Sequence, residues 1–571
     1  MGRLGRGLLN MWCLGFIALI AACGGGSGGE FSEYIDNNTS SAPAASSSSS
    51  QSQDGQVNLS GRLTYDFVPL DSGGLNYSQT EERPIRGAVV NLVDAEGSLV
   101  QTQLSDDEGR YQFSVATGTQ VKVQVEARSR FDGEQSWTLQ VEDNTRANAL
   151  YRMEGEVISV ESVNTQRDLH APSGWTGDGY GEPRAAAPFA ILDTAWEVLQ
   201  HLREADPQLQ LPAARFRWSP NNAPVDGLVT DGDIGTSYYD GQALYILGAE
   251  DSDTDEYDRH IIAHEWAHFL EDSLARIDTI GGPHAQGEKL DMRVAYSEGV
   301  ANALAGFTLD DPLYFDSVGV NQSEVAGFDI AQDVVSNPGW FSESSIQAVF
   351  YHWLEKVGIT PFYEVITDES FRQNSALVSV FLFADVLSSR QADNVWGSAQ
   401  DSAAAEFFDL YREQRMNSRD RYGAGERNNG ATANVLPLYL RLQSLFGQSI
   451  EVCSSQKNGS AQSGFERNFN KLGVHRFVRF RPMNTAVYEI SVEQTQAAST
   501  NSDPDIEVYR RGGLVARGFT DDAGSESLEV ELEGNEEYIL SVYDYADHPA
   551  IGQSAYQPSC FNLSVSLAGG E

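Results

Sequence analysis

The alternation of apolar and polar residues divides the chain into stretches of different expected structure. Residues 57–150 and 449–571 contain short runs in which every second residue is apolar, separated by Gly, Asp and Ser, a pattern typical of antiparallel strands. Residues 151–448 instead have apolar residues three and four positions apart, which predicts helices, with strand-like runs such as 243–247 between them. We therefore expect a multidomain chain in which an α+β domain is flanked by two antiparallel β-sandwich domains.

The individual runs locate the expected elements. The expected helices are 187–202, 259–277, 346–357, 376–387 and 403–416. The expected strands are 57–63, 89–93, 111–115 and 121–125 on one side of them, and 477–480, 488–492, 506–509, 528–532, 538–542 and 561–565 on the other.

Residues 1–23 have the features of a bacterial secretion signal. Arg3 and Arg6 provide a basic start, and the apolar run 14–20 is too short to span a bilayer. The run leads into Leu-Ile-Ala-Ala-Cys, which resembles the lipobox of bacterial lipoproteins and implies that Cys23 carries the lipid. An ordinary signal peptide with an incidental Cys is the alternative. The Gly after Cys23 implies, by the same resemblance, export to the outer membrane of a Gram-negative bacterium, and leaves the membrane face open.

Residues 24–56 are composed mainly of Gly, Ser, Ala, Asn and Gln, including five consecutive Ser at 46–50. Such a segment has almost nothing to bury. We therefore expect a disordered tether that holds the folded part of the chain away from the lipid.

Charge and cysteine content narrow the function classes. The 571 residues include 38 Lys and Arg against 82 Asp and Glu, a formal net charge of −44, which argues against a nucleic-acid partner because phosphate binding requires basic patches. Hydrophobic residues make up 41% of the chain, which argues against a wholly disordered acidic chain. Only four Cys are present, so a metal would be held by His and carboxylate side chains.

One motif carries the chemical prediction. Residues 264–268, His-Glu-Trp-Ala-His, lie within the expected helix 259–277. Residues i and i+4 share a helix face, so His264 and His268 can bind one Zn²⁺ while Glu265 reaches a metal-bound water. The alternative is a surface helix with two solvated His side chains.

The third ligand has several candidates. Glu271 and Asp272 follow His268 within about one turn, where their side chains point along the helix rather than across the metal. His284, in the loop Gly-Gly-Pro-His, stays open as an alternative. Glu298 opens the small-residue run 299–306, which would let two helices approach closely, and it is a further candidate.

The motif at 264–268 followed by Glu298 resembles the gluzincin metallopeptidases, in particular the thermolysin-like and fungalysin-like group. In that class the third ligand is a Glu from a second helix downstream, so the resemblance implies Glu298 as the preferred third ligand. The resemblance implies that Glu265 acts as general base on the zinc-bound water. It also implies that Asn302, four positions after Glu298 where the family has an acidic residue, hydrogen-bonds a ligand His. A downstream Tyr or His would stabilise the oxyanion; we expect Tyr351, with His352 as the alternative.

The resemblance also implies how substrate would bind. A peptide would lie extended beside an edge strand, and 243–247 is the expected strand. The fourth metal position would stay open for water, as in a catalytic zinc site.

The flanking domains have their own resemblances. The run 86–92 followed by 106–113 resembles carboxypeptidase-regulatory-like sandwiches, which implies a spacer or binding module at 57–150. Residues 449–571 resemble the pre-peptidase C-terminal sandwiches of secreted bacterial peptidases. Cys453 and Cys560 bracket this segment, and Cys13 and Cys23 are accounted for by the signal and the lipid. We therefore expect a disulfide between Cys453 and Cys560 in the exported chain.

The acidic run 250–258 precedes the motif helix. One interpretation is that Asp258 or Asp255 caps the helix and interacts with its positive N-terminal end. The other is a Ca²⁺ site, because oxygen ligands are dense here although their spacing matches no EF-hand loop.

Together these observations predict an exported, lipid-anchored zinc metallopeptidase that hydrolyses envelope or extracellular proteins or peptides and meets the membrane only through its lipid. Two alternatives belong to other classes. One is a catalytically silent surface binding lipoprotein with a structural zinc site, and the other is a zinc hydrolase of non-peptide amides. Oligomeric state and cleavage specificity stay open.

Overall fold

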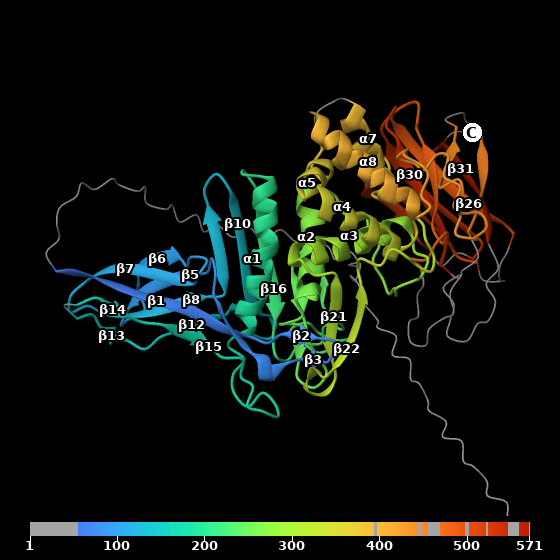
Figure 1. Cartoon of the computed structure of the whole chain (residues 1–571). Helices are drawn as coiled ribbons and strands as arrows, with labels where there is room; N and C mark the ends of the chain where they lie inside the picture. Colours follow the sequence, from blue (N-terminus) through green and yellow to red (C-terminus); the bar gives the residue numbers. More distant parts are fainter. Residues whose placement is uncertain are drawn as a thin grey trace, which may run out of the picture.

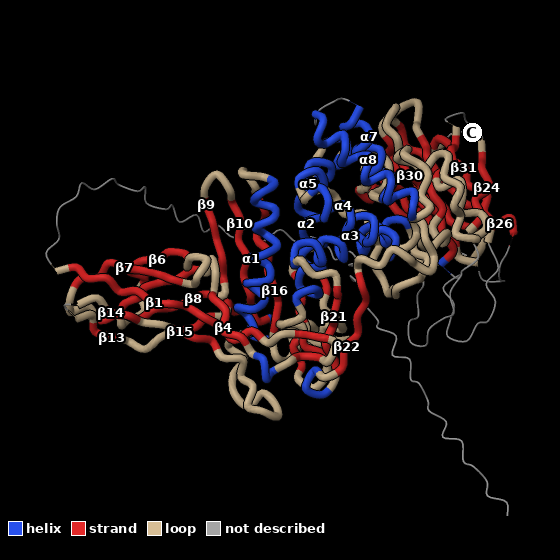
Figure 2. The backbone as a smooth tube through the Cα atoms, viewed as in Figure 1, coloured by secondary structure: helices blue, strands red, loops and turns tan. Residues whose placement is uncertain are grey.

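The computed structural model describes residues 55–161, 163–392, 397–443, 448–454, 469–496, 502–520, 523–545 and 559–569. The expected secretion signal, Cys23 and nearly all of the expected tether lie outside these residues. Figures 1 and 2 show a β-rich part at each end of the molecule and helices between them. The overall architecture is thus mixed, with β-sandwich-like ends.

The N-terminal sandwich has two facing sheets. In the first, β1 (Gln56–Phe67) pairs with β4 (Glu81–Pro84), β7 (Arg110–Ala116), β14 (Thr165–Gln166) and β15 (Leu169–Ala171). The second contains β5 (Val89–Asp94), β6 (Leu99–Leu104), β8 (Gln120–Glu126), β12 (Arg152–Glu154) and β13 (Ile158–Ser159). Burial alternates strictly along β7, as the period of two predicts for a strand with one face on a core.

The central region, residues 128–150 and 172–438, is built on a second sheet. Its strand order is β11 (Ala149–Leu150), β10 (Ser136–Asp143), β16 (Gln210–Trp218), β18 (Leu244–Ile246) and β17 (Tyr238–Tyr239), and β9 (Arg128–Asp132) also pairs with β10. Because β10 and β16 pair in parallel, strands from before residue 150 belong to this sheet. The boundary that we expected at residue 150 therefore does not separate two sheets.

The N-terminal sandwich and the central region also share one hydrophobic core. Gly87 lies against the indole of Trp196, and a Cβ on Gly87 would lie 2.5 Å from that ring. Trp137 on β10 meets the same indole edge-to-face, with ring centroids 5.4 Å apart. These two parts therefore form one packed unit.

Eight α-helices are described, all in the central region. They are α1 (Ala187–Ala205), α2 (Arg259–Leu274), α3 (Met292–Leu309), α4 (Glu343–Val357), α5 (Thr360–Ile366), α6 (Glu369–Arg372), α7 (Val380–Ala392) and α8 (Gly397–Glu413). Local sequence explains their starts: Pro188 lies in the first turn of α1, and Asp291 and Ser342 cap α3 and α4 through their side chains. None of the described helices is long and apolar enough to cross a membrane.

Short strands and 3₁₀ turns complete this region. A small sheet has the order β19 (Gly248–Ala249), β20 (Asp253–Thr254), β21 (Leu313–Val318) and β22 (Glu324–Asp329). β2 (Leu70–Asp71) and β3 (Gly74–Leu75) form a hairpin, and the 3₁₀ turns are η1 (Tyr77–Gln79), η2 (Asn144–Arg146) and η3 (Val320–Gln322). β20 and β21 both lie near the site. β20 comes shortly before α2 in the sequence, and β21 packs next to α2 in space.

The C-terminal sandwich has a separate core. One sheet has the order β23 (Tyr439–Leu442), β25 (Arg476–Phe480), β30 (Tyr538–Asp544), β27 (Pro504–Arg510) and β28 (Gly513–Gly518). The other has the order β24 (Ser449–Cys453), β31 (Cys560–Leu567), β26 (Ala486–Gln496) and β29 (Ser525–Leu532). Since β23 pairs with β25, this sandwich starts about ten residues before the boundary expected at 448.

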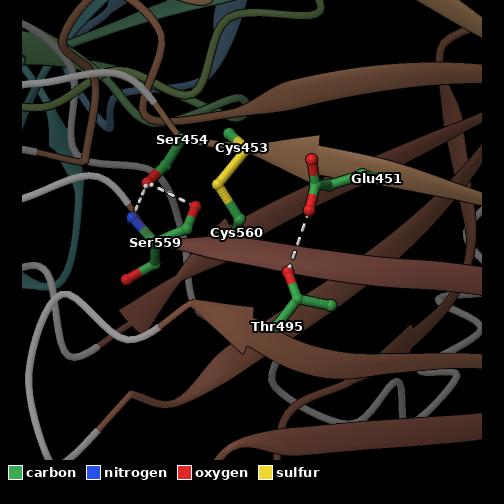
Figure 3. Close-up of a disulfide and its surroundings, with 6 residues drawn as sticks. All are labelled: Glu451, Cys453, Ser454, Thr495, Ser559 and Cys560. Carbon is green, nitrogen blue, oxygen red and sulfur yellow. Dashed lines mark hydrogen bonds between the residues drawn. A yellow bond between two sulfur atoms is a disulfide. The ribbon is translucent and has the colours of Figure 1, made fainter.

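A disulfide joins Cys453 and Cys560. The two residues are direct partners in the antiparallel pair of β24 and β31. Figure 3 shows the bond beside Ser454 and Ser559, where the Ser559 amide donates to Ser454 Oγ over 3.1 Å and the Ser454 amide donates to the Ser559 carbonyl over 2.9 Å. The bond therefore links β24 to its neighbour β31, the last strand of the sandwich in sequence.

Candidate metal centre

Two helices that pack together supply the candidate ligands. α2 carries His264 and His268 one turn apart, and α3 carries Glu298 opposite them. The small residues after Glu298 also let α4 approach, since a Cβ on Gly299 would lie 2.5 Å from Ile346 Cβ. Three helices therefore meet at the motif.

The three candidate ligands converge on one point. His264 Nε2 lies 3.1 Å from His268 Nε2 and 3.2 Å from Glu298 Oε2, and His268 Nε2 lies 3.4 Å from the same oxygen. Ligand atoms bound at about 2.1 Å to one tetrahedral metal lie about 3.4 Å apart. The three side chains are at most 1% exposed. The group has the spacing and burial of a metal site.

The hydrogen bonds of His264 favour a cation at this point. Its Nδ1 lies 2.8 Å from Asn302 Oδ1, and Asn302 Nδ2 donates to Glu343 Oε1 over 2.8 Å. Since the amide nitrogen must face the carboxylate, the amide oxygen faces His264, and Nδ1 carries the proton. Nε2 of neutral His264 then presents a lone pair, with the carboxylate of Glu298 beside it. Donors arranged in this way require a metal ion or protons between them.

Glu265 lies beside the ligands without belonging to the group. Its side chain points to the edge of the central sheet, where it accepts a hydrogen bond from the Tyr239 backbone amide. Burial raises the pKa of Glu265, while the charges of His264 and His268 oppose the rise. A carboxyl group with a raised pKa next to a metal site is suited to accept and return a proton.

The alternative third ligands lie elsewhere. Glu271 contacts Ser297, with its Oε2 2.7 Å from the hydroxyl, and Asp272 accepts from the Tyr239 hydroxyl over 2.8 Å. His284 Nε2 lies 3.7 Å from Glu298 Oε2 and 3.5 Å from Glu343 Oε2. His284 is therefore a neighbour of Glu298 and falls outside the compact group of His264, His268 and Glu298.

The loop that carries His284 is held by the residues of the C-terminal sandwich that precede β25. Asn470 Nδ2 donates to the Gly281 and Pro283 carbonyls over 2.9 and 3.1 Å, and Lys471 Nζ lies 2.7 Å from Glu288 Oε2. This contact fixes the loop between α2 and α3 over the candidate centre.

Tyr351 is not at the centre, which corrects the expectation from sequence. Glu343, Gln347 and Tyr351 share one face of α4, but only the first two reach Asn302. Tyr351 lies two turns beyond Glu343, against Gly306 near the end of α3. Eight residues of helix separate Gly306 from Glu298, about 12 Å.

The alternative, His352, is also remote. Its Nε2 lies 3.0 Å from the Ala331 carbonyl and 3.0 Å from Asp333 Oδ1. Both of its partners follow β22, on the side of α4 turned away from the ligands. The sequence alternatives for an oxyanion-stabilising side chain therefore both fail on position.

Tyr314 on β21 is a site neighbour that sequence reasoning missed. Its ring meets the His264 imidazole edge-on, with centroids 6.2 Å apart. Burial raises the pKa of Tyr314 far above its ordinary value, and the nearby charge of Glu265 raises it further. Tyr314 follows α3 by only five residues, but nothing in the local pattern distinguishes it from a core tyrosine.

The strand expected to bind substrate is also different. β18, at the expected position 243–247, pairs with β16 on one side and β17 on the other. Both of its edges are occupied, so a peptide cannot add to it. β17, the last strand in the order of this sheet, is the edge nearest Glu265.

A second acidic group lies near the start of α2. Asp253 and Asp255 from the expected acidic run meet Asp316 of β21, with one carboxylate oxygen of each within 4.8 Å of the others. One oxygen of each of the three is buried without a hydrogen-bond partner. Burial raises the pKa of Asp316 to about 6, and burial and neighbouring Asp charges raise the pKa of Asp253 and Asp255. The group has the composition of a hard-cation site.

Asp258 does not cap α2 as one interpretation of the acidic run expected. It occupies the position before the helix, but its side chain makes no capping bond. Instead it accepts from the Ser317 amide over 2.6 Å and from the Ser317 hydroxyl over 3.0 Å. Asp258 therefore fastens β21 to the start of α2.

Comparisons with known proteins found structural neighbours with low TM-scores and low sequence identity. No protein-family model matches the chain, and no curated protein matches it. Among solved structures, the chain is similar to the pre-peptidase C-terminal domain of a collagenase from Bacillus anthracis, with 14% identity over 22% of this chain and 94% of that chain and a TM-score of 0.15. It is also similar to a periplasmic inhibitor of g-type lysozyme from Aeromonas hydrophila, with 12% identity over 22% of this chain and 97% of that chain and a TM-score of 0.14.

Proposed function

We propose that this chain is a zinc-dependent peptidase whose metal ligands are His264, His268 and Glu298. The observation that carries the proposal is the position of Glu265: a buried carboxyl group that is not a ligand adjoins a compact two-His, one-Glu group. Two imidazoles and one carboxylate form a donor set that Zn²⁺ prefers, and three protein ligands are typical of catalytic zinc.

The residues would share the work as follows. Zinc, when bound, supplies a Lewis acid that activates water and polarises a carbonyl. Glu265 would accept the proton of the attacking water and return it to the leaving amine. The Tyr239 amide would hold Glu265 in place through its hydrogen bond. Tyr314, whose ring meets the imidazole of the ligand His264, replaces Tyr351 as the candidate for a donor to the developing oxyanion.

The edge strand β17 supports a peptide as substrate. Strand addition to an edge recognises the peptide backbone independently of side chains, and β17 carries the amide that contacts Glu265. A peptide along β17 would therefore bring its carbonyl groups next to the proposed base. A zinc hydrolase of other amides is the alternative within the same chemistry.

The test uses the chain from residue 55 onward, which contains every described element, loaded with zinc. Cleavage of quenched-fluorescent casein is measured with and without a zinc chelator, beside a Glu265→Gln variant. We expect cleavage by the parent, loss on chelation with recovery on adding zinc, and a decrease of at least 1,000-fold in the variant, about the range assigned to a general base and its positioning.

Glu364→Gln is the matched control, since Glu364 lies on α5 outside the centre and its substitution should leave cleavage unchanged. A zinc-loaded, folded parent that cleaves no protein substrate would refute the peptidase and favour a surface binding protein with a structural metal. Cleavage that survives Glu265→Gln would refute the proposed role of Glu265.

We further propose Ca²⁺ as the ion of the group formed by Asp253, Asp255 and Asp316. Carboxylate oxygens are hard ligands that suit Ca²⁺, and the group joins the start of α2 to β21. Lipid attachment at Cys23 and export to an outer membrane also remain part of the proposal. Labelling with radioactive palmitate should mark the parent and spare a Cys23→Ala variant.

A further inference from the structure

Each ligand imidazole is linked to a carboxylate through one intervening side chain, without direct contact. On the α3 side, His268 Nδ1 lies 3.2 Å from Ser297 Oγ, and that hydroxyl donates to Glu271 Oε2 over 2.7 Å. On the α4 side, His264 Nδ1 lies 2.8 Å from Asn302 Oδ1, and Asn302 Nδ2 donates to Glu343 Oε1 over 2.8 Å. In each case one neutral side chain separates an imidazole from a glutamate.

Hydrogen-bond chemistry gives both chains the same direction. A carboxylate only accepts hydrogen bonds, so the Ser297 hydroxyl donates its single proton to Glu271. The hydroxyl oxygen then accepts a hydrogen bond from His268 Nδ1–H. Asn302 likewise uses its amide protons on Glu343 and Gln347, whose Oε1 is 3.1 Å away, and keeps its oxygen for His264. Each imidazole is therefore held with Nδ1 protonated and Nε2 free for a metal.

Both intermediaries and one of the two glutamates are buried. Ser297 and Asn302 are at most 1% exposed, and Glu343 is 2% exposed. Glu271 is half-buried overall, but its Oε1 is buried without a hydrogen-bond partner. Water is therefore a poor substitute for these contacts. Loss of the charge on either carboxylate changes the electrostatic environment of the imidazole to which it is linked.

We propose that Glu343 and Glu271 are positioning residues that orient and polarise the two ligand histidines through Asn302 and Ser297. The proposal rests on the proposed zinc centre. It adds that the two glutamates act on the ligand histidines indirectly, each through one neutral side chain. A neutral side chain between them still orients the imidazole, as a directly bonded carboxylate would. The negative charge of the carboxylate then acts less strongly on the imidazole. The metal then keeps more of its own positive charge than it would beside two directly bonded carboxylates.

This arrangement makes position 302 specific for Asn. In an Asn302→Asp protein, a second carboxylate oxygen would face Glu343 Oε1 where the amide nitrogen now donates. Gln347 can turn its amide to donate, but Glu343 has no proton to offer. In the double variant Asn302→Asp with Glu343→Gln, Gln at position 343 can donate to Asp at 302, so the chain of bonds is complete again with its charge moved one residue nearer His264.

The test measures metal binding by the purified full chain rather than proteolysis. Zinc affinity of the metal-free protein is determined by competition with a chromophoric chelator, and Co²⁺ absorption reports the coordination geometry. Circular dichroism melting of each metal-free variant separates an effect on the centre from unfolding. We expect Glu343→Gln and Glu271→Gln each to weaken zinc binding by 10- to 100-fold, the usual range for groups that support metal ligands.

Three further variants make the outcome decisive. Asn302→Asp should weaken zinc binding at least 10-fold, and the double variant with Glu343→Gln should return to within about threefold of the parent. Glu355→Gln, an exposed position on the same helix α4, should bind zinc like the parent.

Parent-like zinc affinity in both Glu343→Gln and Glu271→Gln would overturn the proposal, as would an Asn302→Asp protein that binds zinc more tightly than the parent. A parent that binds no zinc would overturn both this proposal and the peptidase. A parent that binds zinc with the expected variant pattern but cleaves no protein would overturn the peptidase alone.

Discussion

Removal of calcium should destabilise the group formed by Asp253, Asp255 and Asp316. One oxygen from each carboxylate lies within 4.8 Å of the others. Two unit charges at this distance repel by about 3.5 kcal/mol at an effective dielectric constant near 20. Three such pairs reach about 10 kcal/mol, comparable to the free energy of unfolding of a whole domain. The ionised group therefore requires a cation.

The expected size of the effect follows from mass action. Calcium at 100 times its Kd adds about 2.7 kcal/mol to the folded state. For a cooperative unit of 150 to 250 residues, this corresponds to a rise of about 5 to 10 °C in Tm. Scanning calorimetry at pH 8 with 5 mM CaCl₂ or with EGTA measures the difference, on protein whose zinc site is kept saturated.

The pH dependence has a definite sign. Burial raises the pKa of Asp316 to about 6 in the calcium-free protein, so the stabilising effect of the protonated group is complete below its unfolded value near 4 and is lost as pH rises through 6. Calcium-free protein should thus lose stability as pH rises from about 4 to about 7. The calcium effect should be largest at pH 8 and close to zero at pH 5, where protons occupy the same oxygens.

Variants identify the site. Asp316→Asn should lose the response to calcium and, in EGTA at pH 8, should be at least as stable as the parent because one charge is gone. Glu324→Gln, exposed on the adjacent strand β22, should respond like the parent. Equal Tm values in calcium and EGTA at pH 8 for the parent, or an undiminished response in Asp316→Asn, would refute the reasoning.

Three further predictions concern packing and the C-terminal sandwich. Cys453→Ser should cost the C-terminal sandwich about 4 to 5 kcal/mol, since the disulfide closes a loop across 107 residues; a Tm of this sandwich that is equal with and without the bond would contradict this. Asp505→Asn should stabilise the same sandwich at pH 8 by up to about 4 kcal/mol and have little effect at pH 4, because burial raises the pKa of Asp505 to about 7 and its ionisation above that pH is unfavourable; a pH-independent gain in denaturant titrations would show another cause. Gly299→Ala should cost about 1 to 3 kcal/mol and weaken zinc binding, because the added Cβ would lie 2.5 Å from Ile346 Cβ; a variant that is more stable than the parent would show that α4 can move away freely.

The sequence by itself predicted the features that depend on local spacing. His264 and His268 share a helix face because four residues are about one helical turn, and the helix at 259–274 has them side by side. The period of two located the strands of both sandwiches, and the small residues after Glu298 indicated a helix packed closely at that face. Glu298 could be placed with the two histidines because the resemblance supplied the one long-range pairing that spacing does not contain.

Only the tertiary structure decided which distant residues meet. Tyr351 has the right residue type and shares the helix face of Glu343, but α4 crosses α3 so that Tyr351 lies two turns beyond the ligands. The apolar run 243–247 was expected to form the edge strand beside the site, but β18 lies inside the sheet and β17 forms its edge. Strand order and helix crossing depend on contacts between residues far apart in sequence, and periodicity carries no information about them.

The same reason explains the residues that sequence reasoning missed. Asp316 joins Asp253 and Asp255 across more than 60 residues because β20 pairs with β21. Glu343 reaches His264 through Asn302 because α4 packs on α3. A buried carboxylate looks like any other acidic residue in the sequence; its role at a site is set by the donors and acceptors that the fold brings within hydrogen-bond distance.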